Sequence, residues 1–292
     1  MQTIRVSTFD APGTRAQIRS VPRPNVPDRA ALIRIDACGV CGTDLHILRG
    51  HWPKPLPWPL TLGHELAGVI EEKGPGLQSD FMEQPLACCI RALNRAVAAD
   101  GFHVGDTVVI QGSGPIGLFA LVAAQEMGAG CVVVVGAPEQ PRLAVCRAFG
   151  AAATVSIDEY PTPQSRIDAV RAIVGGFGAD LVVECSGHPS SGPEGIEMLR
   201  DGGAYVEMAQ FTDAGSIETN WHRICTKDIT ILASWAFTAN DIPLGIQMIH
   251  RVAERYPWQL VQTRFSFSQE GIAEAAEAAS AMRCMKATIV PG

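Results

Sequence analysis

A glycine-rich stretch at residues 112–117, with the sequence Gly-Ser-Gly-Pro-Ile-Gly, most constrains the fold of this 292-residue chain. It follows a short apolar run at 107–110 and opens an apolar segment at 115–127, and a further apolar run begins fourteen residues after Gly117. A GxGxxG string alone is weak evidence, because glycines cluster in many turns. Placed between a strand and a helix, however, it is typical of a loop that binds the pyrophosphate of a dinucleotide.

The motif predicts a structural role for each glycine of this loop. Gly112 permits the tight turn, Gly114 lets the backbone approach the pyrophosphate, and Gly117 allows close packing of helix against strand. Pro115 and Ile116 begin the helix, whose unpaired amides and partial positive charge favour a phosphate group. The alternative is an ordinary strand-to-helix turn, and we favour the cofactor.

Apolar strands alternate with helices well beyond this loop, which predicts a parallel, doubly wound α/β sheet. We therefore predict a Rossmann dinucleotide-binding domain over residues 86–236. The remainder, at 1–85 and 237–292, is predicted to form a second, strand-rich domain. Strands are expected at 31–37, 66–72, 107–110, 131–135, 153–155, 180–184, 204–208, 229–233, 264–267 and 286–290, and helices at 115–127, 143–149, 164–174, 193–199, 242–255 and 269–281.

The end of the second strand of this domain bears on the choice of dinucleotide. An acidic residue there would accept a hydrogen bond from the adenosine ribose and favour NAD. Gly136 stands at that place instead, with no arginine beside it. Glu139 could reach the ribose and Arg142 could meet a phosphate. The choice between NAD and NADP therefore stays open, with a slight leaning to NAD.

A second loop is expected at the same edge of the sheet. Ser186 lies in a Cys-Ser-Gly turn that follows the strand at 180–184. Ligands bind outside the carboxyl ends of strands in such sheets, so Ser186 is a candidate to contact the nicotinamide. An ordinary turn explains the three residues equally well.

Three side chains near the N-terminus are of the types that bind zinc. They are Cys41, His64 and Glu65, and a catalytic zinc site needs three protein ligands and an open fourth position. Cys38 and Cys41 also form a CxxC pair, which could be a redox dithiol or part of a structural zinc site. Neither alternative has its usual context, so we favour Cys41 as a ligand and Cys38 as a buried, silent thiol.

Composition excludes several classes of function. The formal net charge is -7, and no basic stripe is present to displace the counterions of a nucleic acid. No apolar run is long enough to span a bilayer. The first residues lack the pattern of a secretory signal, and nine scattered cysteines do not form a disulfide framework. We therefore expect a cytoplasmic protein that binds neither nucleic acid nor membrane.

Taken together, these motifs resemble the zinc-dependent medium-chain alcohol dehydrogenases, nearest to the sorbitol and threonine dehydrogenase branch. The segments that carry the resemblance are 41–46, 63–65, 112–117, 180–187 and 286–291. The resemblance implies a GroES-like, β-rich catalytic domain beside the Rossmann domain. It also implies hydride transfer between NAD(P) and a secondary alcohol or polyol, which would become a ketone or aldehyde. A homodimer is a further expectation by analogy.

The resemblance assigns roles to individual residues. Cys41 and His64 would ligate one catalytic zinc, with Glu65 as the third ligand or a close outer partner. Thr43 would take the alcohol proton and pass it through the cofactor ribose to His46, near solvent. Without the resemblance, a turn-capping hydroxyl and a solvated loop histidine would be the better interpretations of Thr43 and His46.

The chain departs from the family pattern in two places. Gln84 stands where the family has a further carboxylate or cysteine, and Glu83 lies one place away. After Gly76 the chain passes almost directly to the next domain, as though several dozen residues were deleted. The four-cysteine lobe is missing, so no structural zinc is expected. The alternative function is an impaired or non-catalytic dinucleotide-binding protein.

Overall fold

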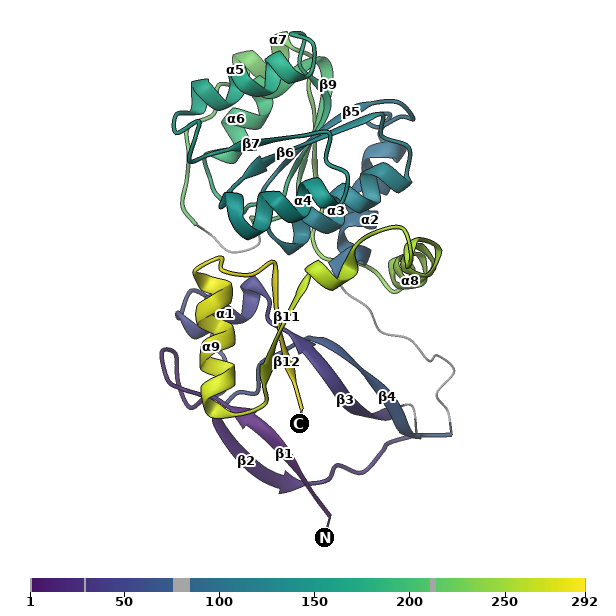
Figure 1. Cartoon of the computed structure of the whole chain (residues 1–292), viewed down its shortest axis with the longest axis vertical. Coiled ribbons are helices and arrows are strands. Elements are labelled where there is room, and N and C mark those ends of the chain that lie inside the picture. The colour runs from purple at the N-terminus through teal and green to yellow at the C-terminus, as the bar shows by residue number, and fades with distance from the viewer. Residues whose placement is uncertain (1, 29, 76–84, 211–213, 292) are drawn as a thin grey trace. The chain divides into compact units, whose positions relative to one another are not determined.

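The computed structural model describes residues 2–28, 30–75, 85–210 and 214–291 (Figure 1). The chain divides into two compact units, Met1–Glu83 with Gln262–Gly292, and Gln84–Val261. The predictions on Gly76, Glu83 and Gln84 fall outside the described residues. No helix among the described residues is long and apolar enough to cross a membrane.

The described residues of the first unit form two small sheets and two helices. Strands β1 and β2 form an antiparallel hairpin, and a four-stranded sheet has the order β11-β12-β3-β4. Within that sheet β11 and β12 are parallel and the other pairs antiparallel. The elements are β1 (Thr3–Thr8), β2 (Gln17–Pro22), β3 (Ala31–Gly39), α1 (Gly42–Leu48), β4 (Glu65–Lys73), β11 (Gln262–Ser266), α9 (Gln269–Ser280) and β12 (Lys286–Val290).

The second unit is a six-stranded parallel sheet in the order β10-β9-β8-β5-β6-β7. In Figure 1, α2, α3 and α4 cover one face of it, and α5 and α6 the other. The strands are β5 (Thr107–Gln111), β6 (Cys131–Gly136), β7 (Ala153–Ser156), β8 (Ala179–Glu184), β9 (Leu199–Glu207) and β10 (Thr230–Ala233). The helices are α2 (Pro85–Ala98), α3 (Pro115–Glu126), α4 (Ala144–Ala148), α5 (Pro163–Ile173), α6 (Ser191–Met198), α7 (Trp221–Thr226) and α8 (Asp241–Val252), with a π-helical turn at Glu139–Leu143 and a 3-10 turn at Trp258–Leu260.

The order of this sheet places the ligand site. The chain leaves β5 toward β6 on one side and later returns to β8 on the other, so β5 and β8 flank the point where the strand order reverses. Ligands of doubly wound sheets bind outside the carboxyl ends of the strands at that point. The loop at 112–117 follows β5, and Ser186 follows β8. Both predicted cofactor loops therefore lie at the switch point.

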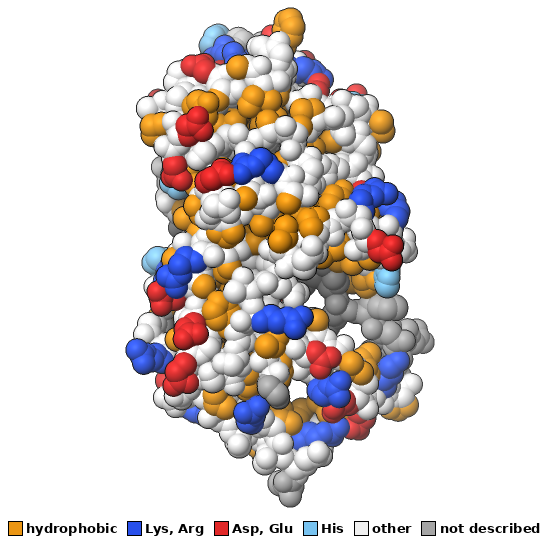
Figure 2. All heavy atoms as spheres, viewed as in Figure 1, with side chains coloured by type: hydrophobic (Ala, Val, Ile, Leu, Met, Phe, Trp, Pro, Cys, Tyr) orange, Lys and Arg blue, Asp and Glu red, His pale blue; other side chains and the backbone are white. Residues whose placement is uncertain are grey.

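Continuous apolar strands explain why this sheet is covered on both faces. Val109, Val133 and Val182 are fully buried, as is expected for central strands packed between two helical layers. On the face seen in Figure 2, charged side chains of both signs are interspersed over the described residues rather than gathered by sign.

The segment 237–261 lies in the second unit, although the sequence pattern assigns it to the strand-rich domain. Helix α8 is amphipathic, buries Met248 and Val252, and packs on α2. Beyond it, the ring of Tyr256 stacks on Phe149 at 5.4 Å between centroids. These are contacts between segments far apart in the sequence, which periodicity alone does not reveal.

Candidate active site

Cys41, His64 and Glu65 converge in the first unit. One potential ligand atom from each lies within 4.8 Å of the others. Cys41 is the residue that precedes α1, and Glu65 begins β4. The antiparallel pairing of β3 with β4 sets Gly39 opposite Glu65, which brings the two segments together. Sulfur, imidazole nitrogen and carboxylate oxygen form a donor set that fits zinc.

Asp44 holds two parts of this cluster in place. One carboxylate oxygen accepts a hydrogen bond from the backbone N–H of Cys41 at 2.9 Å, and the other accepts from that of Gly63 at 3.2 Å. The second oxygen also lies 3.3 Å from Nδ1 of His64. A carboxylate on Nδ1 leaves Nε2 of His64 to face a metal, and such partners orient ligating histidines. No local pattern in the sequence predicts this contact between Asp44 and His64.

Neighbouring charged groups change the pKa of His64 and hold the Glu65 carboxylate. The hydrogen bond to Asp44, followed in size by that to Cys41, raises the pKa of His64 to about 10. Glu65 forms an ion pair with Lys286, a buried lysine at the start of β12. A Cβ on Gly39 would overlap with the Glu65 carboxylate and the end of the Lys286 side chain, so a larger residue there would displace this ion pair. The sequence predicted Lys286 only as part of the strand at 286–290, with no role beside the ligands.

Cys38 takes no part in the ligand cluster. Burial, followed by the charge of Asp44, raises the pKa of the Cys38 thiol to about 11. Its sulfur packs against Gly63, where an added Cβ would lie 2.7 Å from it. A thiol protonated at neutral pH is a poor redox nucleophile. The thiol is half-buried rather than buried, and these observations favour a silent thiol over a redox dithiol.

Thr43 and His46 lie three residues apart in α1, and therefore on the same side of that helix. Oγ1 of Thr43 is 3.7 Å from Sγ of Cys41, so the hydroxyl borders the ligand cluster. Burial, followed by the charges of Arg49 and His51, lowers the pKa of His46. A neutral imidazole next to solvent can accept a proton. Their predicted roles in proton transfer are compatible with these positions.

The glycine loop has the backbone that its sequence predicts. Gly112 has φ +122°, a value that favours glycine. Gly114 is extended and precedes α3, and Pro115 occupies the first helical turn. A Cβ on Gly117 would overlap with the carbonyl oxygen of Gly112, so the helix approaches the loop too closely for any side chain. The carbonyl of Ile116 accepts a bond from Cys89 at 3.5 Å.

Gly136, at the end of β6, has no room for a side chain. A Cβ there would lie 2.6 Å from Cβ of Ser113, whose hydroxyl donates to the carbonyl of Ala137. Glu139, the candidate for the ribose, is paired with Arg147. Arg142 extends toward the loop, and its guanidinium lies 3.7 Å from where a Cβ of Gly114 would be.

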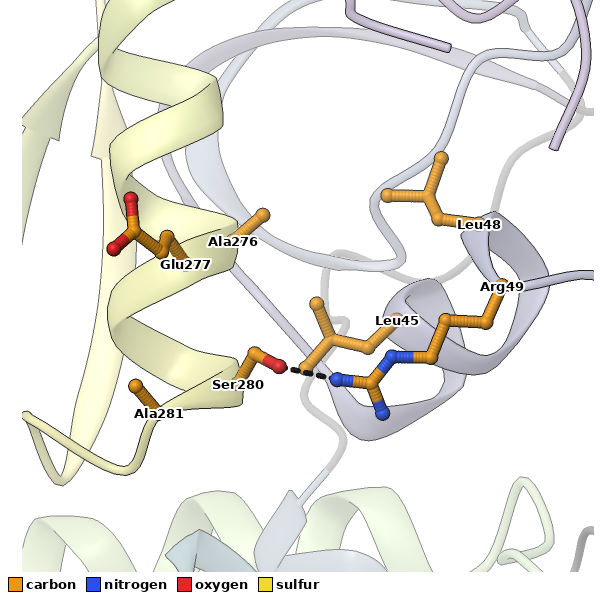
Figure 3. Close-up of a pocket in the computed structure, with 7 residues that line it drawn as sticks. All are labelled: Leu45, Leu48, Arg49, Ala276, Glu277, Ser280 and Ala281. Atoms are coloured by element: carbon orange, nitrogen blue, oxygen red, sulfur yellow. Dashed lines mark hydrogen bonds between the residues drawn. The ribbon is translucent and has the colours of Figure 1, made fainter. Parts of the chain in front are cut away.

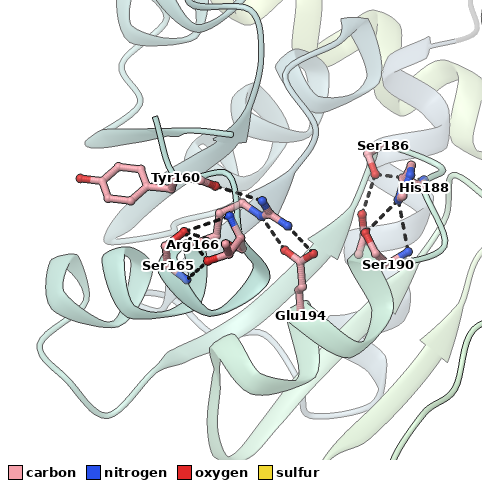
Figure 4. A network of polar contacts seen from close by, with 9 residues as sticks. Tyr160, Ser165, Arg166, Ser186, His188, Ser190 and Glu194 are labelled. Carbon is pink, nitrogen blue, oxygen red and sulfur yellow. Dashed lines mark hydrogen bonds and ion pairs between the residues drawn. The ribbon is translucent and has the colours of Figure 1, made fainter. Parts of the chain in front are cut away.

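Ser186 sits at the start of a polar network that leads into α6 (Figure 4). Its hydroxyl accepts from the backbone N–H of His188 at 3.1 Å and lies 2.8 Å from the hydroxyl of Ser191. Further along the same helix, Glu194 is paired with Arg166 of α5 at 2.7 Å. The network fixes the turn after β8 relative to α6.

A groove of about 360 Å³ lies between α1 and α9 of the first unit (Figure 3). Its lining is mostly apolar, and Arg49 donates a hydrogen bond to Ser280 across it. None of the candidate ligands lines it. We assign it no catalytic part.

Two models of known protein families match overlapping parts of this chain. Residues 27–154 match the alcohol dehydrogenase GroES-like domain, and residues 115–251 match the zinc-binding dehydrogenase domain. The chain is 30% identical to probable D-xylulose reductase A of Emericella nidulans, over 79% of this chain and 81% of that protein. It is 27% identical to 5-exo-hydroxycamphor dehydrogenase of Pseudomonas putida over 330 aligned positions, covering 87% and 90%. An alcohol dehydrogenase structure from Thermotoga maritima superposes with a TM-score of 0.85 at 20% identity, covering all of both chains.

The chain therefore belongs to the zinc-dependent medium-chain alcohol dehydrogenase family. Its fold is the one predicted, a GroES-like domain with a Rossmann-like domain. It is an oxidoreductase that acts on alcohols with zinc and NAD(P).

Proposed function

We propose that this protein reversibly oxidises a secondary alcohol or polyol, using one zinc ion held by Cys41, His64 and Glu65. The observation that carries the proposal is the convergence of these three ligand atoms within 4.8 Å. The names of the relatives support the substrate class, because they include a sorbitol dehydrogenase and a probable D-xylulose reductase. Family membership favours a working enzyme over the alternative of a non-catalytic dinucleotide-binding protein.

The chain's own residues prepare the reaction. Zinc, when bound, supplies a Lewis acid that makes an alcohol easier to deprotonate. Asp44 holds the imidazole of His64 in one orientation, and Lys286 limits the movement of the Glu65 carboxylate. The Thr43 hydroxyl can accept and donate a proton, and the His46 imidazole can pass a proton to solvent.

The test is an assay of the full-length protein loaded with zinc. We expect about one zinc ion per chain, because the described residues offer one ligand cluster. We expect secondary alcohols and polyols to be oxidised with reduction of the dinucleotide, followed by absorbance. The matching ketones should be reduced in the opposite direction. Zinc-loaded protein that binds a dinucleotide but turns over none of these compounds would favour the non-catalytic alternative instead.

The dinucleotide preference is a second expected result. Glu139 is the candidate to reach the ribose, and its carboxylate is paired with Arg147. Because no carboxylate at Gly136 repels a 2′-phosphate, we expect kcat/KM for NAD and NADP to agree within about tenfold. Arg142→Ala should lower the NADP value about tenfold and leave the NAD value unchanged. An NAD preference above about a hundredfold would contradict this assignment.

A shortened catalytic domain is supported by the length of one alignment. The alignment with the hydroxycamphor dehydrogenase runs over 330 positions, more than the 292 residues of this chain, so it opens gaps in the chain. This agrees with a deletion after Gly76, which stays a prediction. We also propose the absence of a structural zinc, because the chain has no four-cysteine lobe.

Assembly and location stay predictions. A homodimer is compatible with β10, an edge strand of the six-stranded sheet with an exposed Ile231, followed by an exposed Trp235. Sedimentation velocity of the purified protein would measure its mass. A cytoplasmic location is predicted from the scattered cysteines.

A further inference from the structure

Three polar side chains form a row across neighbouring strands at the switch point. Gln111 of β5 is paired in register with Glu184 of β8, and Glu184 with Glu207 of β9. Parallel strands in register present paired residues on the same face of the sheet. Glu184 is fully buried and Gln111 nearly so. The row therefore places two carboxylates side by side in a poorly solvated part of the unit.

Each carboxylate holds the turn that follows its own strand. Oε1 of Glu184 accepts from the backbone N–H groups of Ser186 at 2.7 Å and Gly187 at 2.9 Å, and from the Ser186 hydroxyl at 2.5 Å. Oε1 of Glu207 accepts from the N–H groups of Ala209 at 3.3 Å and Gln210 at 3.2 Å. The acidic side chains thus shape both turns at this end of the sheet.

The two remaining carboxylate oxygens differ in their donors. Oε2 of Glu207 accepts from the Tyr205 hydroxyl at 3.4 Å and the Gln210 amide at 3.3 Å. Oε2 of Glu184 is buried and has no hydrogen-bond donor among the described residues, and neither has Oε1 of Gln111. A buried acceptor without a donor is costly. A proton on Oε2 of Glu184 would satisfy that atom and let it donate to Glu207, which lies within reach.

The turn held by Glu184 abuts the glycine loop. The backbone N–H of Cys185 donates to the carbonyl of Gln111 at 2.7 Å. A Cβ on Gly112 would lie 2.7 Å from the carbonyl carbon of Cys185 and 2.8 Å from the nitrogen of Ser186. On its other side, Gly187 lies against Ala209. A shift of this turn would therefore displace the loop proposed to bind the pyrophosphate.

We propose that Glu184 and Glu207 share one proton, carried by Glu184, and that this neutral Glu184 is a positioning residue for the dinucleotide-binding loops. The proposal rests on the proposed cofactor site. Loss of the proton leaves two negative charges side by side, and their repulsion separates the turns that follow β8 and β9. The dinucleotide then binds a loop that is less well ordered.

The surroundings agree with a proton at neutral pH. Burial, and the neighbouring charge of Glu207, raise the pKa of Glu184 to about 7, against hydrogen bonds from Ser186 that lower it. The other titratable groups nearby stay neutral, because burial raises the pKa of Cys185 and Tyr205. On α2, Cys89 is close enough to raise the pKa of Cys185 further. On α6, the charge of Glu194 is paired with Arg166.

The first measurement is infrared spectroscopy of the full-length, zinc-loaded protein without dinucleotide. We expect the carbonyl band of a protonated, buried carboxyl group at pH 6, its loss as pH rises through about 7, and its absence in Glu184→Gln. In Glu207→Gln the repelling charge is gone, so the band should disappear at least about one pH unit lower. A wild-type spectrum with no such band at pH 6, or a Glu207→Gln band that titrates like wild type, overturns the shared proton.

The second measurement is NADH and NADPH fluorescence on binding, between pH 6 and 8.5. We expect affinity to fall about tenfold over this range in the wild type and to stay constant in Glu184→Gln, whose amide cannot ionise. The unfolding temperature of the wild type should also fall as the pH rises. An acid whose pKa rises from 4.5 unfolded to about 7 folded stabilises the protein most below pH 4.5, and that stability is lost as pH rises to about 7.

The outcomes separate this inference from the proposed function. A wild-type protein that shows the band but binds neither dinucleotide contradicts the cofactor site, and with it the positioning role. Normal binding with the same pH dependence in Glu184→Gln overturns the inference alone. Should Glu184→Gln fail to fold, Glu207→Gln decides the question, because its shift in both measurements must occur.

Discussion

Cys41→Ser is expected to remove most of the bound zinc and to lower kcat/KM for alcohol oxidation at least about a thousandfold. The serine hydroxyl is close in size to the thiol but remains protonated, so it cannot replace the thiolate as a ligand. A bound metal contributes several kcal/mol of charge stabilisation in the transition state, which corresponds to roughly that loss of rate. Zinc per chain by atomic absorption and steady-state kinetics measure the two effects.

Cys38→Ser is the matched control, since it makes the same change three residues earlier. Cys38 lies outside the ligand cluster, so zinc content should stay at about one per chain and kcat/KM within about threefold of wild type. Equal loss of zinc in both variants would show that the CxxC pair binds metal as a unit. Full activity in Cys41→Ser would refute the metal site altogether.

The sequence predicted most of the Rossmann-like domain because its strands are continuous apolar runs separated by helices. The glycine loop was also predicted from the sequence. Each glycine of the motif stands where the backbone conformation or close packing requires it. Helix α8 was predicted as a helix of the strand-rich domain, whereas it lies in the second unit. The apolar face of this helix predicts that it packs against another element. Only the three-dimensional structure identifies that element as α2.

The sequence predicted part of the candidate metal site. Cys41, His64 and Glu65 were found from their ligand types, and the pairing of β3 with β4 explains why they meet. The contact of Asp44 with His64 spans twenty residues, and that of Lys286 with Glu65 spans about three quarters of the chain. Such partners leave no local pattern, so the charges that surround a ligand come from the fold and not from a motif.

Gly117→Ala is expected to destabilise the second unit and abolish dinucleotide binding. The added Cβ would overlap with the carbonyl oxygen of Gly112, which is backbone and cannot turn away. Helix α3 or the loop must therefore move. Overpacking of this kind costs about 1–3 kcal/mol, which lowers Tm by roughly 3–10 °C for a unit of this size. Differential scanning calorimetry measures the change, and NADH fluorescence measures binding.

Gly114→Ala tests whether a side chain at this position blocks the dinucleotide without destabilising the protein. Its Cβ would meet only the Arg142 guanidinium, at 3.7 Å, and its extended backbone suits alanine. Losing glycine before α3 costs up to about 1 kcal/mol, so Tm should fall by no more than about 3 °C. The methyl group would stand where the pyrophosphate approaches, so affinity for NADH and NADPH should fall at least about tenfold.

Gly192→Ala is the control for both substitutions, because its Cβ would lie in α6 with only the Tyr205 hydroxyl near it, at 3.9 Å. Alanine is the better helix former, so Tm should stay constant or rise slightly, with normal binding. If Gly114→Ala bound both dinucleotides as tightly as Gly192→Ala does, the phosphate would lie elsewhere. The loop at 112–117 would then be a packing device for α3 and nothing more.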